Sequence, residues 1–186
     1  MTHSAREIEI KLAVPDVRTA RGLLRAAGFR VFKRRVFETN AVFDTPEMSM
    51  RRAATMLRVR QAGGVATVTY KGPPDAGRHK SREELELEIS DARAMSAIIE
   101  RLGLGPVFHY EKYRTEYRQP GHSGIATLDE TPVGVYLELE GTPPWIARSA
   151  RKLGFAEDDY ITASYARLYL EWCERSGTRP SDMVFQ

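Results

Sequence analysis

The sequence predicts an α+β protein in which eight antiparallel strands close a β-barrel, or tunnel, and helices pack outside it. Eight segments alternate polar and apolar residues with the period of two that is typical of strands. Four further segments repeat apolar residues at helical spacing, and each ends next to a glycine. An acidic strand followed by a helix occurs three times, as EIEIK before AAGF, ELELEIS before RLGL and YLELE before KLGF. This recurrence favours a pseudo-symmetric barrel.

The expected elements lie between prolines, which fall in the loops or at the first residue of a helix. Strands are predicted over residues 6–14, 30–44, 56–61, 65–71, 82–90, 107–118, 125–129 and 133–140. Helices are predicted over residues 16–27, 91–102, 144–153 and 162–176. Gly63-Gly64, PGHSG and TPVG each join two strands, so most neighbours should pair antiparallel. We expect residues 1–176 to form one domain and residues 177–186 a loosely held C-terminal tail.

Length and composition are those of an ordinary globular protein. The chain has 186 residues, enough for one domain, with 42% hydrophobic and 28% charged residues, which excludes a disordered chain. No apolar run approaches the roughly 20 residues of a membrane helix, and no apolar stretch near residue 1 resembles a signal peptide, so we expect a cytoplasmic protein without a membrane partner. The lone Cys173 excludes an internal disulfide and a cysteine zinc cage.

Nearly every predicted strand has one apolar and one charged face, because side chains alternate along a strand. The charged faces carry Glu7, Glu9, Lys11, Arg58, Arg60, Lys71, Arg82, Glu84, Glu86, Glu88, Lys112, Arg114, Asp129, Glu138 and Glu140. One such strand alone is typical of an open sheet whose charged face meets water. Four amphipathic helices that cover the apolar side favour the alternative, in which the sheet closes and the charged faces line a tunnel.

A tunnel lined by so many ionisable groups requires a bound partner, because desolvating paired charges often costs more than their attraction returns. Arg and Lys side chains bind phosphate oxygens, and carboxylates supply the oxygen ligands that Mg²⁺ or Mn²⁺ prefer. An eight-stranded barrel has room for one small ligand. The sequence therefore indicates a polyphosphate anion bound together with divalent metal ions.

Motifs in a fixed order support this interpretation. EIEIK at residues 7–11 is followed by FDTP (43–46), LRVR (57–60), TYKGP (69–73), REELELE (82–88), EKYR (111–114), LDE (128–130) and LELE (137–140). The series, with its ExExK start, resembles the CYTH superfamily, also called triphosphate tunnel metalloenzymes. The resemblance spans roughly residues 6–172 and is strongest to the bacterial and archaeal branch named after class IV adenylate cyclases.

The resemblance implies a role for each matching residue. Divalent metal, Mg²⁺ or Mn²⁺, would be held by Glu7, Glu9, Asp129, Glu138 and Glu140. The triphosphate would be bound by Lys11, Arg58, Arg60, Lys71, Lys112 and Arg114. Catalysis would depend on Glu7, Glu9, Lys11, Glu138 and Glu140, with Glu84 and Glu86 as a second acidic cluster. We expect Glu9→Gln or Glu140→Gln to leave the metal-free protein as stable or more so, because each carboxylate would face others.

The resemblance implies a metal-dependent enzyme acting on the triphosphate group of ATP, thiamine triphosphate or tripolyphosphate. Attack by the ribose 3′-hydroxyl on the α-phosphorus yields cyclic AMP and pyrophosphate, whereas attack by water on the γ-phosphorus makes the enzyme a triphosphatase. The alternatives are a non-catalytic nucleotide or polyphosphate sensor and an RNA-binding protein. The short basic cluster at residues 32–35 disfavours RNA, because such clusters are usually solvated surface. The oligomeric state stays open, with a homodimer as one alternative.

Overall fold

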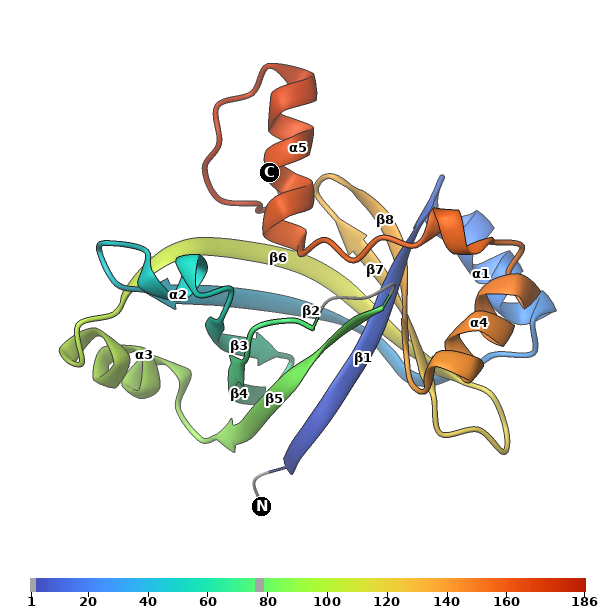
Figure 1. The fold of residues 1–186 in the computed structure, drawn as a ribbon, viewed down its shortest axis with the longest axis horizontal. Helices are drawn as coiled ribbons and strands as arrows, with labels where there is room; N and C mark the ends of the chain where they lie inside the picture. Colours follow the sequence, from blue (N-terminus) through green and yellow to red (C-terminus); the bar gives the residue numbers. More distant parts are fainter. Residues whose placement is uncertain (1–2, 76–78) are drawn as a thin grey trace.

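The computed structural model describes residues 3–75 and 79–186, and within them eight strands close a barrel (Figure 1). The strands are β1 (His3–Val14), β2 (Arg30–Asp44), β3 (Met56–Ala62), β4 (Val65–Lys71), β5 (Lys80–Ile89), β6 (Gly105–Arg118), β7 (Ile125–Thr131) and β8 (Gly134–Glu140). They follow the order β1-β5-β4-β3-β2-β6-β7-β8, and every neighbouring pair is antiparallel. The predicted barrel is confirmed.

The predicted turns join the expected strands. β3 and β4 pair up to Ala62 and Val65, on either side of Gly63-Gly64, and β7 and β8 pair up to Thr131 and Gly134. Gly63 has a φ of 58°, in the left-handed region that glycine adopts without steric cost. Tight turns at these points set the strand register and therefore the face that each side chain occupies.

The four predicted helices are α1 (Val17–Ala26), α3 (Ala92–Arg101), α4 (Pro143–Lys152) and α5 (Tyr165–Ser176). The side chains of Asp16, Asp91 and Ser164 accept hydrogen bonds from backbone N–H groups in the first turns of α1, α3 and α5. A glycine with positive φ follows each helix: Gly28, Gly103, Gly154 and Gly177. None of the helices within residues 3–75 and 79–186 combines the length and hydrophobicity of a membrane-spanning helix.

The sequence analysis did not predict α2 (Ser49–Arg52) or the 3₁₀ helix η1 (Glu157–Asp159). Both are too short to show a helical period. Asp44, at the end of β2, stabilises α2 because its buried carboxylate accepts hydrogen bonds from the backbone N–H groups of Met50 and Arg51, each at 2.9 Å. The FDTP motif therefore has a structural role beside the barrel.

Helices cover the apolar outer face of the barrel in two places. α1 and α4 pack on β1, β7 and β8, in a core that includes the fully buried Leu24, Leu137 and Ile146. α3 packs on β3 and β4, where Val59 and Ile99 are buried. Because apolar residues fill the space beneath these helices, the charged faces of the strands turn toward the barrel interior.

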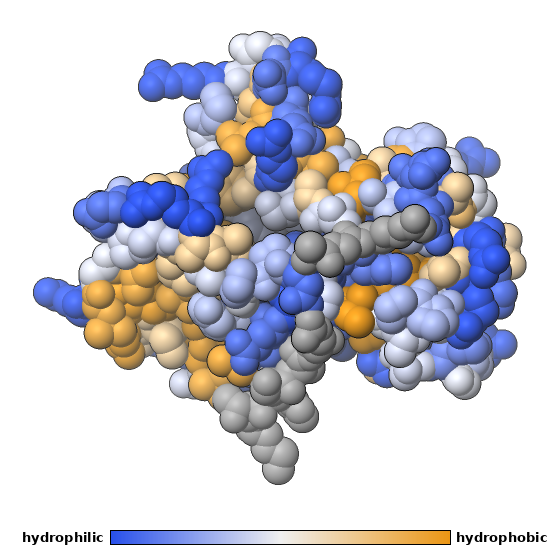
Figure 2. Space-filling model, viewed as in Figure 1, coloured by the Kyte–Doolittle hydropathy of each residue, from blue (hydrophilic) through white to orange (hydrophobic). Residues whose placement is uncertain are grey.

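The outer face of β5 is an exception to the expected helix cover. Leu85 and Leu87 on this strand are 38% and 42% exposed. α3 packs mainly on β3 and β4, and its own Ile98 and Leu102 are also exposed. Figure 2 shows this apolar area over α3 and the strands beside it.

The C-terminal segment lies against the barrel. Met183 is fully buried, its N–H donates to the His109 carbonyl at 3.0 Å, and its carbonyl accepts from the Glu111 N–H at 2.9 Å. Met183 also packs among the aromatic rings that hold α5, including Tyr110 and Tyr169. A loosely held tail was expected over residues 177–186, and within it Met183 is bound to β6 by these contacts.

Candidate active site

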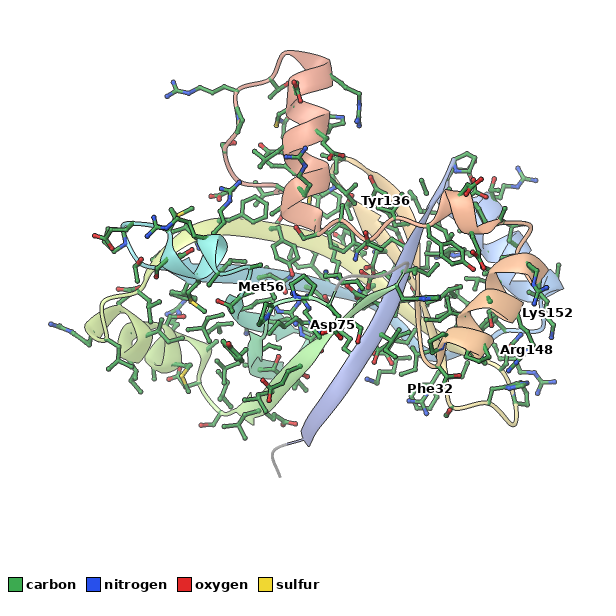
Figure 3. The ribbon with its side chains drawn as sticks, viewed as in Figure 1. Phe32, Met56, Asp75, Tyr136, Arg148 and Lys152 are labelled. Carbon is green, nitrogen blue, oxygen red and sulfur yellow. The ribbon has the colours of Figure 1, made fainter. Side chains whose placement is uncertain are left out.

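The charged strand faces surround a cavity of about 1100 Å³ inside the barrel. Figure 3 shows polar side chains of the strands gathered in this space. With the exception of Asp129, the predicted site residues all line the cavity: Glu7, Glu9, Lys11, Arg58, Arg60, Lys71, Glu84, Glu86, Lys112, Arg114, Glu138 and Glu140. The barrel thus brings residues from both ends of the chain to one site.

Strand register decides which charges meet at β1. The pairing of β1 with β8 places Glu9 opposite Glu140 and Lys11 opposite Glu138, and the pairing with β5 places Glu9 opposite Lys80. Opposed side chains on antiparallel strands share a face and have Cβ atoms about 5 Å apart. The register therefore produces a compact group of carboxylates and amines.

Lys11 lies at the centre of a buried ion-pair network. Its Nζ lies 3.3 Å from Glu9 Oε1 and 3.1 Å from Glu138 Oε1. Burial lowers the pKa of Lys11, but the charges of Glu9 and Glu138 together have the larger effect and hold this pKa above its usual value. Burial likewise opposes ionisation of Glu9, yet Lys11 and Lys80, whose Nζ is 2.9 Å away, hold the pKa of Glu9 well below its usual value.

Lys71 of β4 is shared by two carboxylates. Its Nζ lies 2.6 Å from Glu7 Oε2 and 3.1 Å from Glu84 Oε2. Burial and the neighbouring Glu9 oppose ionisation of Glu7, but Lys71 keeps the pKa of Glu7 below its usual value. Burial and the charge of Glu7 raise the pKa of Glu84. Two carboxylates therefore share Lys71, and Arg82, whose Nε lies 3.6 Å from Glu7 Oε2, is a further cation of this group.

Within the part of the chain that the structure describes, Glu140 is a predicted metal ligand without a close cation. Its side chain is exposed to the cavity, and among the described residues no Lys or Arg nitrogen lies within 4.0 Å of its carboxylate. The surrounding protein limits its solvation, and the charges of Glu7, Glu84 and Glu9 add to this effect, so its pKa rises to about 7. Among the described residues, Glu140 is therefore a carboxylate whose negative charge no adjacent cation pairs.

The opposite wall is rich in guanidinium groups. Arg58 donates to Tyr110 Oη at 3.1 Å and to Thr69 Oγ1 at 3.2 Å, and Arg60 pairs with Glu86 at 3.2 Å. The buried Nε of Arg58 has no hydrogen-bond partner among the described residues. An unpaired buried donor is costly, and a bound phosphate oxygen would satisfy it.

Lys112 and Arg114 of β6 bind Asp129 of β7 beneath the cavity surface. Lys112 Nζ lies 2.9 Å from Asp129 Oδ2, and Arg114 donates from Nε to Oδ1 at 2.7 Å and from Nη2 to Oδ2 at 2.5 Å. Arg114 also contacts Glu138. Asp129 is fully buried and does not line the cavity. The structure therefore places it behind two phosphate-binding candidates rather than beside the other acidic residues.

The sequence analysis did not single out three polar residues of this site. Glu38 on β2 is buried with its Oε2 3.6 Å from Lys112 Nζ, Lys80 contacts Glu9, and the Tyr165 hydroxyl donates to Asp129 at 2.6 Å. Strand alternation could have found Glu38, which shares a face with the buried Asn40. Lys80 precedes the predicted start of its strand, and no pattern in the sequence indicates the contact of Tyr165.

The carboxylates fit a divalent metal by donor chemistry. Among the described residues, no group of three His, Cys, Asp or Glu side chains is already arranged around a metal position, because Glu9 and Glu138 face Lys11. Carboxylate oxygens are nevertheless the hard donors that Mg²⁺ and Mn²⁺ prefer. The excess negative charge at Glu140 is what a divalent cation would neutralise. Glu7, Glu9, Glu138 and Glu140 are therefore suited to hold such an ion.

Comparison with known proteins identifies the family to which this tunnel belongs. The profile of the CYTH domain matches residues 5–186. The chain belongs to the CYTH domain family. A Methanocaldococcus jannaschii protein named as a candidate adenylate cyclase is 33% identical over 173 residues, which are 87% of this chain and 97% of that protein.

Solved structures share the CYTH fold. A Pyrococcus horikoshii protein superimposes with a TM-score of 0.75 at 25% identity, over 87% of this chain and 98% of that chain. A candidate adenylyl cyclase from Hippeastrum, described as having a dominant triphosphatase activity, has a TM-score of 0.66 at 22% identity, over 94% and 97% of the two chains. These likenesses show that the fold is shared.

Proposed function

We propose that this CYTH protein is a divalent-metal-dependent enzyme acting on the triphosphate group of ATP or of another organic or inorganic triphosphate. The supporting observation is the arrangement of charge in one tunnel, where Lys and Arg side chains face carboxylates, of which Glu140 has no paired cation among the described residues. A polyphosphate anion and Mg²⁺ or Mn²⁺ together complement both halves of this arrangement. The general divalent-metal dependence of the CYTH family agrees with this proposal.

The chain's own ion pairs indicate how binding would proceed. Lys71, for example, is 2.6 Å from Glu7, and Lys11 lies between Glu9 and Glu138. A triphosphate that enters alone must draw these lysines from their carboxylates and leave buried negative charge unpaired, which is costly. The freed carboxylates of Glu7, Glu9 and Glu138 would hold a divalent ion, whose charge would remove that cost. Triphosphate and metal should therefore bind cooperatively.

In this mechanism the basic residues bind the phosphate oxygens and fix the direction in which the triphosphate lies in the tunnel. The binding set is Lys11, Arg58, Arg60, Lys71, Lys112 and Arg114. The carboxylates of Glu7, Glu9, Glu138 and Glu140 would hold Mg²⁺ or Mn²⁺, which when bound neutralises developing charge and orients the attacking oxygen. The remaining contribution of the protein is positioning, because phosphoryl and nucleotidyl transfer depend mainly on alignment and charge.

Two reactions are compatible with the same site. Attack by the ribose 3′-hydroxyl on the α-phosphorus of ATP forms cyclic AMP and releases pyrophosphate, whereas attack by water on the γ-phosphorus releases phosphate. The name of the Methanocaldococcus jannaschii relative supports the first, and the description of the Hippeastrum protein supports the second. The direction in which a triphosphate enters the tunnel distinguishes them.

The test is product analysis with matched variants. Purified protein is incubated with ATP, thiamine triphosphate and tripolyphosphate, each with Mg²⁺ or Mn²⁺, and cyclic AMP, pyrophosphate and phosphate are separated. Arg60→Met, in the tunnel wall, should lose at least tenfold in kcat/KM, equivalent to about 1.4 kcal/mol. Arg148→Met is the control, since Arg148 is exposed on α4 and points away from the tunnel (Figure 3). Tight binding without any product would instead indicate a sensor.

A further inference from the structure

α5 meets the tunnel at its first residue, Tyr165. The Ser164 side chain caps the helix by accepting a hydrogen bond from the Arg167 N–H, and the Tyr165 side chain turns into the barrel, where it is buried. Its ring packs against those of Tyr110 and Tyr136, with centroids 6.3 and 5.7 Å away. These contacts fix the direction in which the phenol hydroxyl points.

The Tyr165 hydroxyl donates a hydrogen bond to Asp129 Oδ2 at 2.6 Å. Burial and the negative charge of Asp129 raise the pKa of Tyr165 well above its usual value, so the phenol keeps its proton. Asp129 therefore receives a permanent neutral donor in addition to its two cations. A hydrogen bond of this kind to an ionised acceptor is among the stronger ones in proteins.

The same carboxylate binds two residues of the proposed phosphate site. Asp129 Oδ2 lies 2.9 Å from Lys112 Nζ and 2.5 Å from Arg114 Nη2, so this single oxygen accepts from Lys112, Arg114 and Tyr165. The Tyr165 ring is also 5.0 Å from Lys112 Nζ and 5.2 Å from Lys11 Nζ, within the range of a cation–π interaction. Tyr165 thus contacts Lys112 and Lys11 directly and Arg114 through Asp129.

We propose that Tyr165 is a positioning residue that makes the C-terminal helix part of the phosphate-binding wall. Its hydroxyl satisfies part of the hydrogen-bonding capacity of Asp129, so that Lys112 and Arg114 are held in place but can turn toward phosphate oxygens. This inference rests on the proposed function, because it concerns how the same tunnel binds a triphosphate.

The effect of removing the Tyr165 hydroxyl follows from the donors that remain to Asp129. In Tyr165→Phe the ring stays, but Asp129 retains only Lys112 and Arg114 as donors and draws both more strongly away from the cavity. The triphosphate then loses interactions that it makes in the ground state and in the transition state alike. Losing interactions that are equally strong in both states raises KM and leaves kcat unchanged. We expect KM to rise about tenfold while kcat changes by less than about twofold.

The experiment compares Tyr165→Phe with Tyr136→Phe. Tyr136 is buried beside the start of α5 (Figure 3) and contacts the Tyr165 ring, but it does not line the cavity, and no hydrogen bond of its hydroxyl occurs among the described residues. The dissociation constant of tripolyphosphate is measured by calorimetry, once in a chelator and once with Mg²⁺, beside steady-state kinetics. Tyr165→Phe should weaken binding about tenfold, or about 1.4 kcal/mol, in both conditions, and Tyr136→Phe by less than twofold.

A double-mutant cycle tests whether Tyr165 acts on Lys112 and Arg114 through Asp129. In an Asp129→Asn background, Tyr165→Phe should cause no further loss of affinity, because the acceptor through which it acts has lost its charge. Wild-type affinity in Tyr165→Phe, or an undiminished effect in the Asp129→Asn background, would overturn the inference. So would unfolding of Tyr165→Phe while Tyr136→Phe stays folded, since the hydroxyl would then be structural. If the wild-type protein binds none of tripolyphosphate, ATP and thiamine triphosphate, with or without Mg²⁺, the proposed function fails instead.

Discussion

Glu140→Gln removes a carboxylate on which the charges of Glu7, Glu84 and Glu9 act, opposed by that of Lys71. The surrounding protein and the charges of Glu7, Glu84 and Glu9 raise its pKa from 4.5 to about 7. Because the folded state binds the proton more tightly than the unfolded state, the metal-free protein loses stability as the pH rises from about 4.5 to about 7. Above that range the ionised Glu140 destabilises the fold, and below it the protonated side chain does not. Gln resembles the protonated form at every pH.

The size of the expected stability change follows from the pKa shift of Glu140 and from the exposure of its side chain. A shift from 4.5 to about 7 would correspond to about 3 kcal/mol if none of it were screened. Glu140 is exposed to the cavity, and exposed charge interactions are reduced by solvent to about 1 kcal/mol or less. We therefore expect Glu140→Gln to raise the free energy of unfolding by about 1 kcal/mol at pH 8, or about 3 °C in melting temperature for a chain of this size. At pH 4 the two proteins should be equally stable.

The assay is urea unfolding at pH 4, 6 and 8 in the presence of a chelator. Glu174→Gln is the control, because Glu174 is an exposed carboxylate on α5 and its replacement should change stability by less than about 0.5 kcal/mol. Added Mg²⁺ should stabilise the wild-type protein more than Glu140→Gln, which lacks one metal-binding oxygen pair. A loss of stability in Glu140→Gln, or a gain that is the same at pH 4 and pH 8, would refute the reasoning.

Further outcomes test the rest of the site. Glu9→Gln should lower the free energy of unfolding by about 2 kcal/mol in urea titrations, because it leaves buried Lys11 and Lys80 with one fewer counter-charge; equal stability would contradict the pairing. Turnover should stop in chelator and return with Mg²⁺ or Mn²⁺, and activity that survives exhaustive chelation would refute the metal site. Tripolyphosphate with metal should raise the melting temperature by several degrees and monophosphate much less, whereas equal shifts would indicate nonspecific anion binding. Glu38→Gln should tighten tripolyphosphate binding about threefold by calorimetry, since Glu38 competes for Lys112; unchanged affinity would show that it does not compete.

Much of the tunnel wall could be predicted because alternation along a strand assigns each side chain to a face before any partner is known. Glu7, Glu9 and Lys11 occupy the inner face of β1 as their spacing indicates, while Ile10 and Leu12 are buried on the outer face under helices. The start of β5 differs from the prediction. β5 begins at Lys80 and not at Arg82, which places one further amine in the wall.

Glu9 and Glu140 show where such prediction ends. Both belong to acidic strands with the same pattern, so the same stability was expected for their Gln variants. In the structure β1 passes between β5 and β8, and Glu9 lies close to Lys11 and Lys80 whereas Glu140 has no cation within 4.0 Å among the described residues. The expectation for Glu140 stays a prediction, but the contacts of Glu9 contradict the expectation for that residue. The two residues differ in their neighbouring cations because of strand register, which the sequence of one strand does not determine.

The sequence by itself determined the strand and helix pattern, the charged inner face and the motifs that belong to the CYTH family. Tertiary structure alone decided which charges form pairs, because the partners are far apart in the chain: Lys71 with Glu7, and Tyr165 with Asp129. It also placed Asp129 behind the wall. The physical reason is that alternation is a property of one strand, whereas an ion pair and the pKa of its members depend on distances set by barrel closure.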